Sequence, residues 1–322
     1  MQTKEKIVQY IKNKGQATGS ELSDYLGITD RAVRKQLSSL LEKNILNKIG
    51  RPPKVFYLLK EIDQQENILI DEKELQFINK NYLMITPTGV RKDGFDGFVF
   101  WCNRNNLDIK KTAKEYIQTA KKYNKYKKNG FINGLNKMKE TFKDVYLDQL
   151  YYLDFYSIER FGKTKLGQML LYAKQSQNKN LMKELILDLK PRVEQLMKKY
   201  KIDGVGFIPP TVKRETQFMK ELEKNLHLGA RTISIIKIKT EVAVPQKTLN
   251  KLSDRIENAQ KTIVVNEKDE YKNILLLDDA IGSGATLNET AAQIKAKGIV
   301  KGKIIGLAIT GSFKGFDVIS EV

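Results

Sequence analysis

Hydrophobic residues in the first sixty positions recur first at helical spacing and then at the spacing of strands. Residues 4–41 contain three stretches with an apolar residue every three or four positions, which predicts three amphipathic helices. Thr29 precedes the third stretch and is placed to cap that helix, because its hydroxyl accepts a hydrogen bond from a free backbone N–H. Two strands are predicted at 45–49 and 54–59, joined by the turn Gly50-Arg51-Pro52-Pro53. This order of elements indicates a small separate domain.

The last third of the chain instead alternates short apolar runs with helical stretches, which is typical of an α/β fold with a mainly parallel sheet. Four consecutive aliphatic residues, Ile274–Leu277, predict a strand buried on both faces. Asp278 and Asp279 stand at its carboxyl end, followed by the loop Gly282-Ser283-Gly284. Thr286 opens a helical pattern, so backbone N–H groups and the helix dipole face one point. The sequence therefore predicts an anion site beside two carboxylates, which can bind a diol and a hard cation such as Mg²⁺.

The region between these two parts has a less regular pattern. Residues 61–71 are polar and acidic, which indicates a linker, and the stretch from 72 to 160 favours a mostly helical segment. Gly94 and Gly97 predict turns before an aromatic cluster, and a later helix is predicted to end in the aromatic run Tyr151–Tyr156. Lysines and tyrosines interleave in residues 121–128, which fits contact with a nucleic-acid backbone or, more simply, the solvated end of a helix.

Charge and cysteine content narrow the classes of function. The chain has 57 Lys and Arg residues against 38 Asp and Glu residues, a net charge of +19. This excess favours a polyanionic partner, nucleic acid first, although solvated lysine-rich helix faces also account for lysines. The single cysteine, Cys102, excludes internal disulfides and a Cys-rich zinc ribbon. No apolar run approaches the ~20 residues that span a bilayer, and no signal-peptide pattern is present, so we expect a soluble cytoplasmic protein with no membrane partner.

The helix, helix, helix and hairpin of residues 1–60 resemble a winged helix-turn-helix domain. The third helix leaves polar and basic residues opposite its apolar stripe, and the hairpin turn adds two more, as expected for a helix in the major groove with a wing beside the phosphates. The candidate DNA-binding residues are Thr29, Arg31, Arg34, Lys35, Ser38, Arg51 and Lys54. The resemblance implies duplex DNA as a partner and a homodimer, because such regulators commonly read paired half-sites. Some winged helices bind protein partners instead.

The run I-L-L-L-D-D-A-I-G-S-G-A-T-L at Ile274–Leu287 resembles the phosphoribosyl pyrophosphate (PRPP) signature of type I phosphoribosyltransferases. It differs from a P-loop and from G-x-G-x-x-G. Ala280 replaces a usual larger aliphatic residue, and Gly282 replaces a usual Thr. The resemblance implies that Asp278 and Asp279, the catalytic pair of an active enzyme, bind the ribose hydroxyls and, through them, Mg²⁺. The implied PRPP-binding residues, of which 282–286 hold the 5′-phosphate, are Asp278, Asp279, Ala280, Ile281, Gly282, Ser283, Gly284, Ala285 and Thr286. The alternative is an ordinary α/β crossover with acids at a strand end.

A narrower resemblance, over roughly the last half of the chain, is to the ComF-type branch of these transferases, which is associated with DNA uptake. The shared features are a lysine-bearing helix, a strand ending in prolines at 205–210, and a Q-x-x-L…R-x-x-N segment at 246–258. The Gln-to-Arg spacing is one residue longer than usual, and the zinc ribbon of many members is absent. Lys213, Arg214 and Arg255 are candidates to bind pyrophosphate from loops at strand ends. Arg255 could instead pair with a local acid such as Asp254 or Glu257.

These patterns predict a multidomain chain: a winged helix at 1–60, a linker and mostly α-helical region at 61–160, and an α/β phosphoribosyltransferase fold at 161–322. Three functions fit. The first is a DNA-binding transcriptional regulator that responds to PRPP or a nucleotide. The second is an active phosphoribosyltransferase that moves ribose 5-phosphate from PRPP to an unidentified acceptor. The third is a ComF-like accessory protein in DNA processing or uptake.

Overall fold

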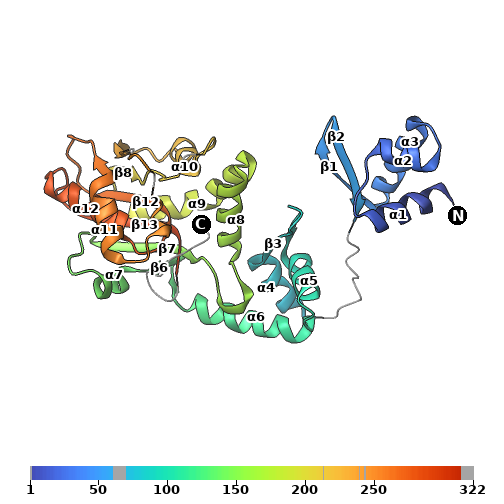
Figure 1. The fold of residues 1–322 in the computed structure, drawn as a ribbon. Coiled ribbons are helices and arrows are strands. Elements are labelled where there is room, and N and C mark those ends of the chain that lie inside the picture. The colour runs from blue at the N-terminus through green and yellow to red at the C-terminus, as the bar shows by residue number, and fades with distance from the viewer. Residues whose placement is uncertain (1, 61–69, 213, 239, 243, 313–322) are drawn as a thin grey trace. The chain divides into compact units, whose positions relative to one another are not determined.

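The computed structural model describes residues 2–60, 70–212, 214–238, 240–242 and 244–312 (Figure 1). The chain divides into two compact units, Met1–Ile68 and Leu69–Val322. The first unit is a helix-turn-helix with a β-hairpin wing, and the second is a mixed α/β unit with a mainly parallel sheet.

The first unit has the predicted order of three helices and a hairpin. Thr29 caps the third helix, its hydroxyl accepting a hydrogen bond from Ala32 N at 3.4 Å. The apolar stripes of all three helices meet in one core, in which Val33, Leu37 and Leu40 are buried. The first strand of the hairpin begins and ends slightly later than predicted, the second has the predicted bounds, and they pair Leu46 with Leu59 through to Arg51 with Lys54. The elements are α1 (Thr3–Lys14), α2 (Gly19–Leu26), α3 (Asp30–Glu42), β1 (Leu46–Arg51) and β2 (Lys54–Leu59).

A seven-stranded sheet organises the second unit, with strands in the order β5-β6-β7-β13-β12-β8-β9. The strands from β7 to β9 in this order run parallel, and β5 and β6 add an antiparallel edge. The strands are β5 (Lys127–Lys128), β6 (Phe131–Asn133), β7 (Gln149–Phe155), β8 (Gly204–Phe207), β9 (Arg231–Ile233), β12 (Ile274–Ile281) and β13 (Ile304–Gly311).

The sheet is covered on both faces, as predicted for Ile274–Leu277. Ile274 and Leu276 of β12 enter one hydrophobic core, and Leu275 and Leu277 enter the other. A strand with alternate residues in two cores needs apolar side chains throughout, which explains the unbroken aliphatic run. The helices of this unit are α4 (Glu72–Asn81), α5 (Gly94–Arg104), α6 (Ile109–Asn124), α7 (Leu135–Thr141), α8 (Lys165–Ser176), α9 (Lys179–Tyr200), α10 (Phe218–Leu226), α11 (Leu252–Thr262) and α12 (Ala285–Ala296).

The region from 70 to 160 differs from its prediction in two places. Gly94 and Gly97 lie inside α5 and not in turns. A Cβ at Gly94 would lie 2.4 Å from Asn79 Oδ1, so glycine is needed there for close packing of α5 on α4. The aromatic run after α7 forms β7, whose parallel pairing with β13 puts this part of the middle region in the main sheet. Two short antiparallel pairs complete the unit, β3 (Leu83–Ile85) with β4 (Arg91–Asp93) and β10 (Ile235–Lys237) with β11 (Ile263–Val265).

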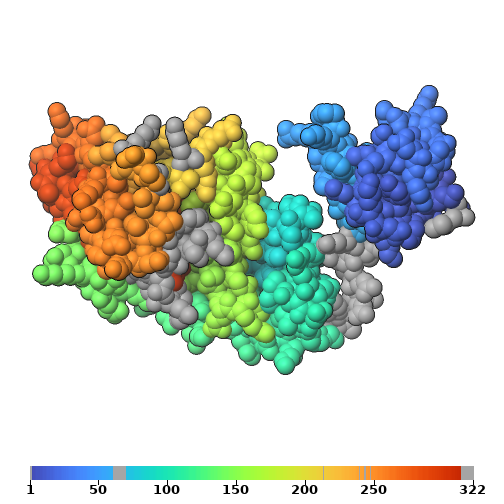
Figure 2. All heavy atoms as spheres, viewed as in Figure 1, coloured from blue at the N-terminus to red at the C-terminus, as the bar shows by residue number. Residues whose placement is uncertain are grey.

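Helices α8 and α9 lie between residues 70–124 and the C-terminal strands. Figure 2 shows their yellow-green atoms between the teal atoms of the former and the yellow and orange atoms of the latter. Arg91 of β4 makes a two-pronged ion pair with Glu184 of α9, at 2.7 and 2.9 Å. Lys165 Nζ of α8 donates to Lys80 O at 3.3 Å. These contacts join the middle region to the helices that border the cavity described next.

Candidate functional site

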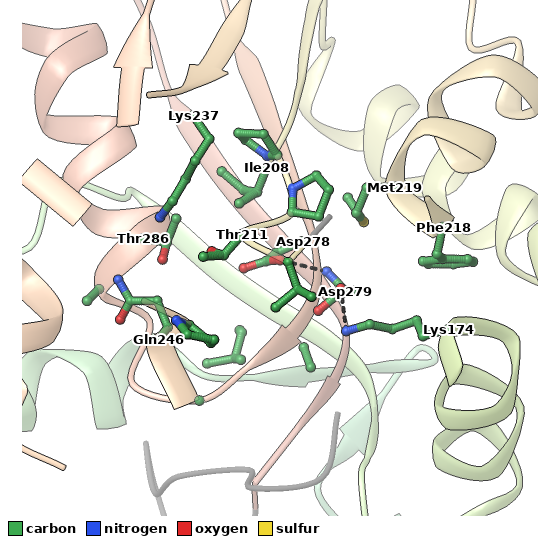
Figure 3. A pocket seen from close by; sticks show the side chains of 18 of the residues that line it. Lys174, Ile208, Thr211, Phe218, Met219, Lys237, Gln246, Asp278, Asp279 and Thr286 are labelled. Carbon is green, nitrogen blue, oxygen red and sulfur yellow. Dashed lines mark hydrogen bonds and ion pairs between the residues drawn. The ribbon is translucent and has the colours of Figure 1, made fainter. Parts of the chain in front are cut away.

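A cavity of about 200 Å³ lies at the carboxyl ends of β8 and β12 (Figure 3). Ligands of open α/β sheets bind at this end, because loops and helix N-termini converge there. The wall comes from the end of α8, the loop after β8, the start of α10, the segment around Gln246 and the whole run from Asp278 to Thr286. The structure therefore brings every residue of the predicted PRPP run to one cavity.

Asp278 and Asp279 have different surroundings although they are neighbours in the chain. Asp279 Oδ2 forms an ion pair with Lys174 Nζ at 2.7 Å, and both side chains are less than a fifth exposed. Asp278 Oδ1 accepts a hydrogen bond from Asp279 N at 2.8 Å. Burial, and then the charge of Asp279, raise the pKa of Asp278 to about 8, against the opposing pull of Lys174 and Lys237. One acid is therefore paired with a cation, and the other holds a proton near neutral pH.

The loop after these acids leads directly into the N-terminus of α12. Gly284 stands at the N-cap with a left-handed backbone (φ +79°), and no side chain caps the helix from that position. Ser283 Oγ accepts from Ala285 N at 3.3 Å. The first-turn amides and the positive end of the helix dipole therefore border the cavity, which suits an anionic oxygen.

The structure describes two of the three residues that were predicted to bind pyrophosphate. Arg214 lines the cavity, with Nη2 3.5 Å from Gln175 Oε1. Arg255 also lines it and is buried, and its Nε donates to Leu249 O at 2.7 Å. Among the described residues its Nη2 has no hydrogen-bond partner and Asp254 and Glu257 do not pair with it, so the alternative of a local ion pair does not hold. Burial lowers the pKa of Arg255. Lys213 lies outside the described residues.

Two cavity lysines were not predicted. Lys174 comes from the C-terminal part of α8, and Lys237 ends β10, where its Nζ donates to Asn258 Oδ1 at 3.3 Å. Burial lowers the pKa of Lys237, and the Asp278 carboxyl acts in the opposite direction. Figure 3 shows Lys174 on one side of the two acids and Lys237 with Thr286 on the other. In sequence, both resemble the many surface lysines, and only the fold separates them.

The candidate DNA-binding residues are exposed on two elements of the first unit, the helix α3 and the hairpin. Arg31, Arg34, Lys35 and Ser38 are exposed on α3, opposite the buried stripe, and Arg51 and Lys54 are exposed at the hairpin turn. Thr29 is exposed at the start of α3, although its hydroxyl is used as the cap. Free basic side chains on a helix and a wing are the groups that contact base edges and phosphates.

A comparison with known protein families matches the first unit. A family model described as an HTH domain matches residues 3–50. A search of curated proteins found no match. The first unit is thus a helix-turn-helix domain with a wing, and such a domain indicates DNA binding.

Within the described part of the chain, no helix is long and apolar enough to cross a membrane. Over the same residues, no three His, Cys, Asp or Glu side chains gather in a group that could hold a metal ion.

Proposed function

We propose that this protein is a DNA-binding regulator whose α/β unit binds PRPP with Mg²⁺, or a nucleotide, and whose affinity for DNA changes when it does. The observation that carries the proposal is the shared cavity of Asp278, Asp279 and the N-terminus of α12. A diol-binding acid pair next to a phosphate cradle matches the two ends of a ribose 5-phosphate. The exposed basic face of α3 supplies the other half of the proposal.

The cavity offers a partner for each part of PRPP. Asp278 and Asp279 would accept hydrogen bonds from the ribose hydroxyls, and the amides of residues 282–286 would bind the 5′-phosphate. The pyrophosphate carries most of the negative charge, and Arg214, Arg255 and Lys237 are the described cations on the cavity wall that would meet it. The Arg255 guanidinium is buried, and its Nη2 has no partner among the described residues, so it gains most from an anionic oxygen.

The two carboxylates suit Mg²⁺ as an ion that is shared with the bound ligand. Mg²⁺ prefers oxygen ligands and often takes one or two carboxylates together with phosphate oxygens of a substrate. Asp278 and Asp279 would hold the ion through the ribose hydroxyls that they bind, and among the described residues no third acid joins them in a cluster. When bound, the ion would neutralise negative charge on the pyrophosphate. The chain's own task is to hold the acids, exclude water and supply the cations.

We expect the affinity for PRPP and Mg²⁺ to rise with pH through the pKa of Asp278. Below about pH 8 the empty site holds a proton on Asp278, and binding selects the carboxylate and so releases that proton. The dissociation constant should therefore fall about tenfold per pH unit between about pH 6.5 and 8 and level off above. Titration calorimetry at several pH values measures this, with Asp278→Asn as the variant that loses the dependence. A flat profile in the unmodified protein contradicts the assignment of Asp278.

The regulatory proposal is tested by DNA footprinting with and without PRPP and Mg²⁺. A regulator protects a defined duplex site, and the ligand changes the protein concentration needed for half-protection by about 5- to 150-fold, the usual size of coupling between two sites. Equal binding to all duplexes and to single strands would favour the accessory function in DNA processing instead. Site protection that PRPP leaves unchanged would reject the ligand response.

Phosphoribosyl transfer is the second candidate, favoured by the cations that surround the acid pair. Lys237, Arg214 and Arg255 would stabilise a departing pyrophosphate while positive charge develops on the ribose. Release of pyrophosphate from PRPP in the presence of purine and pyrimidine bases measures this activity. Turnover that depends on one base would make the protein an enzyme, and it would leave DNA binding by the first unit unaffected.

A further inference from the structure

Most of the excess positive charge lies outside the helix-turn-helix domain. Residues 69–322 contain 45 of the 57 Lys and Arg residues and 30 of the 38 Asp and Glu residues. The cavity uses only a few of these cations.

Three neighbouring strands of the sheet each begin just after an exposed lysine. Lys201 precedes β8, Lys272 precedes β12 and Lys303 precedes β13, and these strands lie side by side in the order β13-β12-β8. Because the three strands are parallel, their starts share one end of the sheet, opposite the cavity. Lys198 and Lys199, exposed at the C-terminus of α9, lie within three residues of Lys201. We call Lys198, Lys199, Lys201, Lys272 and Lys303 the amino-end surface.

Asn273 holds the loops of this surface together. Its Nδ2 donates to Tyr200 O at 2.9 Å and to Lys201 O at 3.4 Å, and its Oδ1 accepts from Lys303 N at 2.8 Å. One side chain thus ties the end of α9 to the start of β13, across the start of β12. Adjacent strands are about 4.8 Å apart, so the three loops form a row about 10 Å wide. The lysine backbones are fixed, and only the side chains remain to be ordered when a partner binds.

The nearby acids are already engaged. Asp203 accepts hydrogen bonds from Lys272 N and Asn273 N, at 2.9 to 3.0 Å, and lies 3.8 Å from Arg231. Glu270 pairs with Lys301. Among the described residues, the five lysines of the amino-end surface have no ion pair. Lys199 Nζ lies over the rings of Tyr151 and Tyr200, at 5.6 and 5.0 Å, and its charge is still open to solvent.

We propose that the amino-end surface binds the phosphate backbone of duplex DNA, as a second DNA contact in addition to that of the helix-turn-helix domain. Duplex DNA carries a charge about every 1.7 Å, so a row about 10 Å wide faces several phosphates. Flexible lysine ammonium groups contact phosphates without reading bases, so this contact adds affinity and not sequence preference. The helix-turn-helix domain would bring duplex DNA to the same chain. A second contact on that chain then strengthens the overall binding, because the first contact raises the effective concentration of DNA at the second. The cavity, at the other end of the sheet, stays open.

The test compares two sets of four lysines in the full-length chain. The first variant is Lys199→Gln/Lys201→Gln/Lys272→Gln/Lys303→Gln. The matched control is Lys110→Gln/Lys111→Gln/Lys114→Gln/Lys121→Gln, which removes the same charge from exposed positions on α6 of the same unit. Binding to a mixed-sequence duplex of about thirty base pairs is followed by fluorescence anisotropy over a range of KCl concentrations, after circular dichroism shows that both variants are folded.

We expect the first variant to bind about tenfold or more weakly, with the slope of log affinity against log salt reduced by about 3 to 4, because each lost phosphate contact contributes about 0.9. The control should stay within about twofold of the unmodified protein. Equal losses in the two variants would show that only net charge matters and would overturn the proposal, as would an unchanged slope in the first variant. The inference does not depend on the PRPP site. The variants of Arg31 and Arg34 test DNA binding by the helix-turn-helix domain separately, so a negative result for the amino-end surface would not affect that assignment.

Discussion

We expect Asp278→Asn/Asp279→Asn to abolish the thermal stabilisation that PRPP and Mg²⁺ would give to the α/β unit. A ligand at a hundred times its dissociation constant stabilises a folded protein by about 2.7 kcal/mol. For a unit of this size each kcal/mol raises Tm by about 2 to 4 °C, so the unmodified protein should gain about 5 to 11 °C. The double variant loses both carboxylates that face the ribose and should gain less than about 1 °C. Differential scanning fluorimetry of the full chain measures both values.

The control for this experiment replaces two exposed acids that do not line the cavity, Asp96→Asn/Glu223→Gln. Its shift with PRPP and Mg²⁺ should equal that of the unmodified protein. The proposed PRPP site is rejected if the unmodified protein shows no shift, or if the double variant of Asp278 and Asp279 keeps it. The comparison also separates specific binding from a general effect of a polyanion on a basic protein.

Arg31→Ala/Arg34→Ala/Lys35→Ala removes site-specific protection of DNA. These side chains are exposed on α3, and each base or phosphate contact of this kind is worth about 1 to 3 kcal/mol. Losing three contacts should weaken specific binding by at least about a hundredfold, with the fold intact because the buried stripe of α3 is unchanged. Footprinting on genomic fragments measures the loss.

The matched control removes three exposed lysines from other faces of the same unit, Lys6→Ala/Lys12→Ala/Lys43→Ala. We expect protection to be weakened only slightly, and by the same factor at all sites. If the α3 variant protects DNA as well as this control does, then α3 does not enter the groove. That outcome would favour a protein partner for the winged helix.

The sequence predicted elements whose signals are local. Thr29 caps α3, and the stripe of Val33, Leu37 and Leu40 is buried, because capping and helical periodicity depend on neighbours in the chain. The burial of Ile274–Leu277 on both faces was predicted equally well, since it requires an unbroken apolar run, but the strand is longer than predicted and continues through both acids to Ile281. The acids and the loop after this strand followed from the same short stretch.

The features that the sequence did not predict depend on contacts between segments that are distant in the chain. Lys174 lies on the lysine-bearing helix of the ComF-type resemblance, but the local sequence does not show that this lysine reaches Asp279 across more than a hundred residues. Gly94 and Gly97 were interpreted as turn residues because glycine favours turns, whereas here α5 needs them to pack closely on its neighbours. Ile233 ends β9 and Ile235 begins β10, and these two short strands pair with different partners.

The place of β7 in the sheet determines where this chain can be cut. All eight residues of β13 are buried, and β7 covers one of its two hydrogen-bonding edges. A fragment that begins near 161 would lack β7 and so expose a long apolar edge strand, the kind of surface that pairs with other chains and aggregates. A fragment that begins near 70 keeps the sheet closed on that side. The two units are therefore best separated at the boundary between 68 and 69. If a shorter fragment were insoluble, the cause would be the exposed strand edge and not a defect of the ligand site.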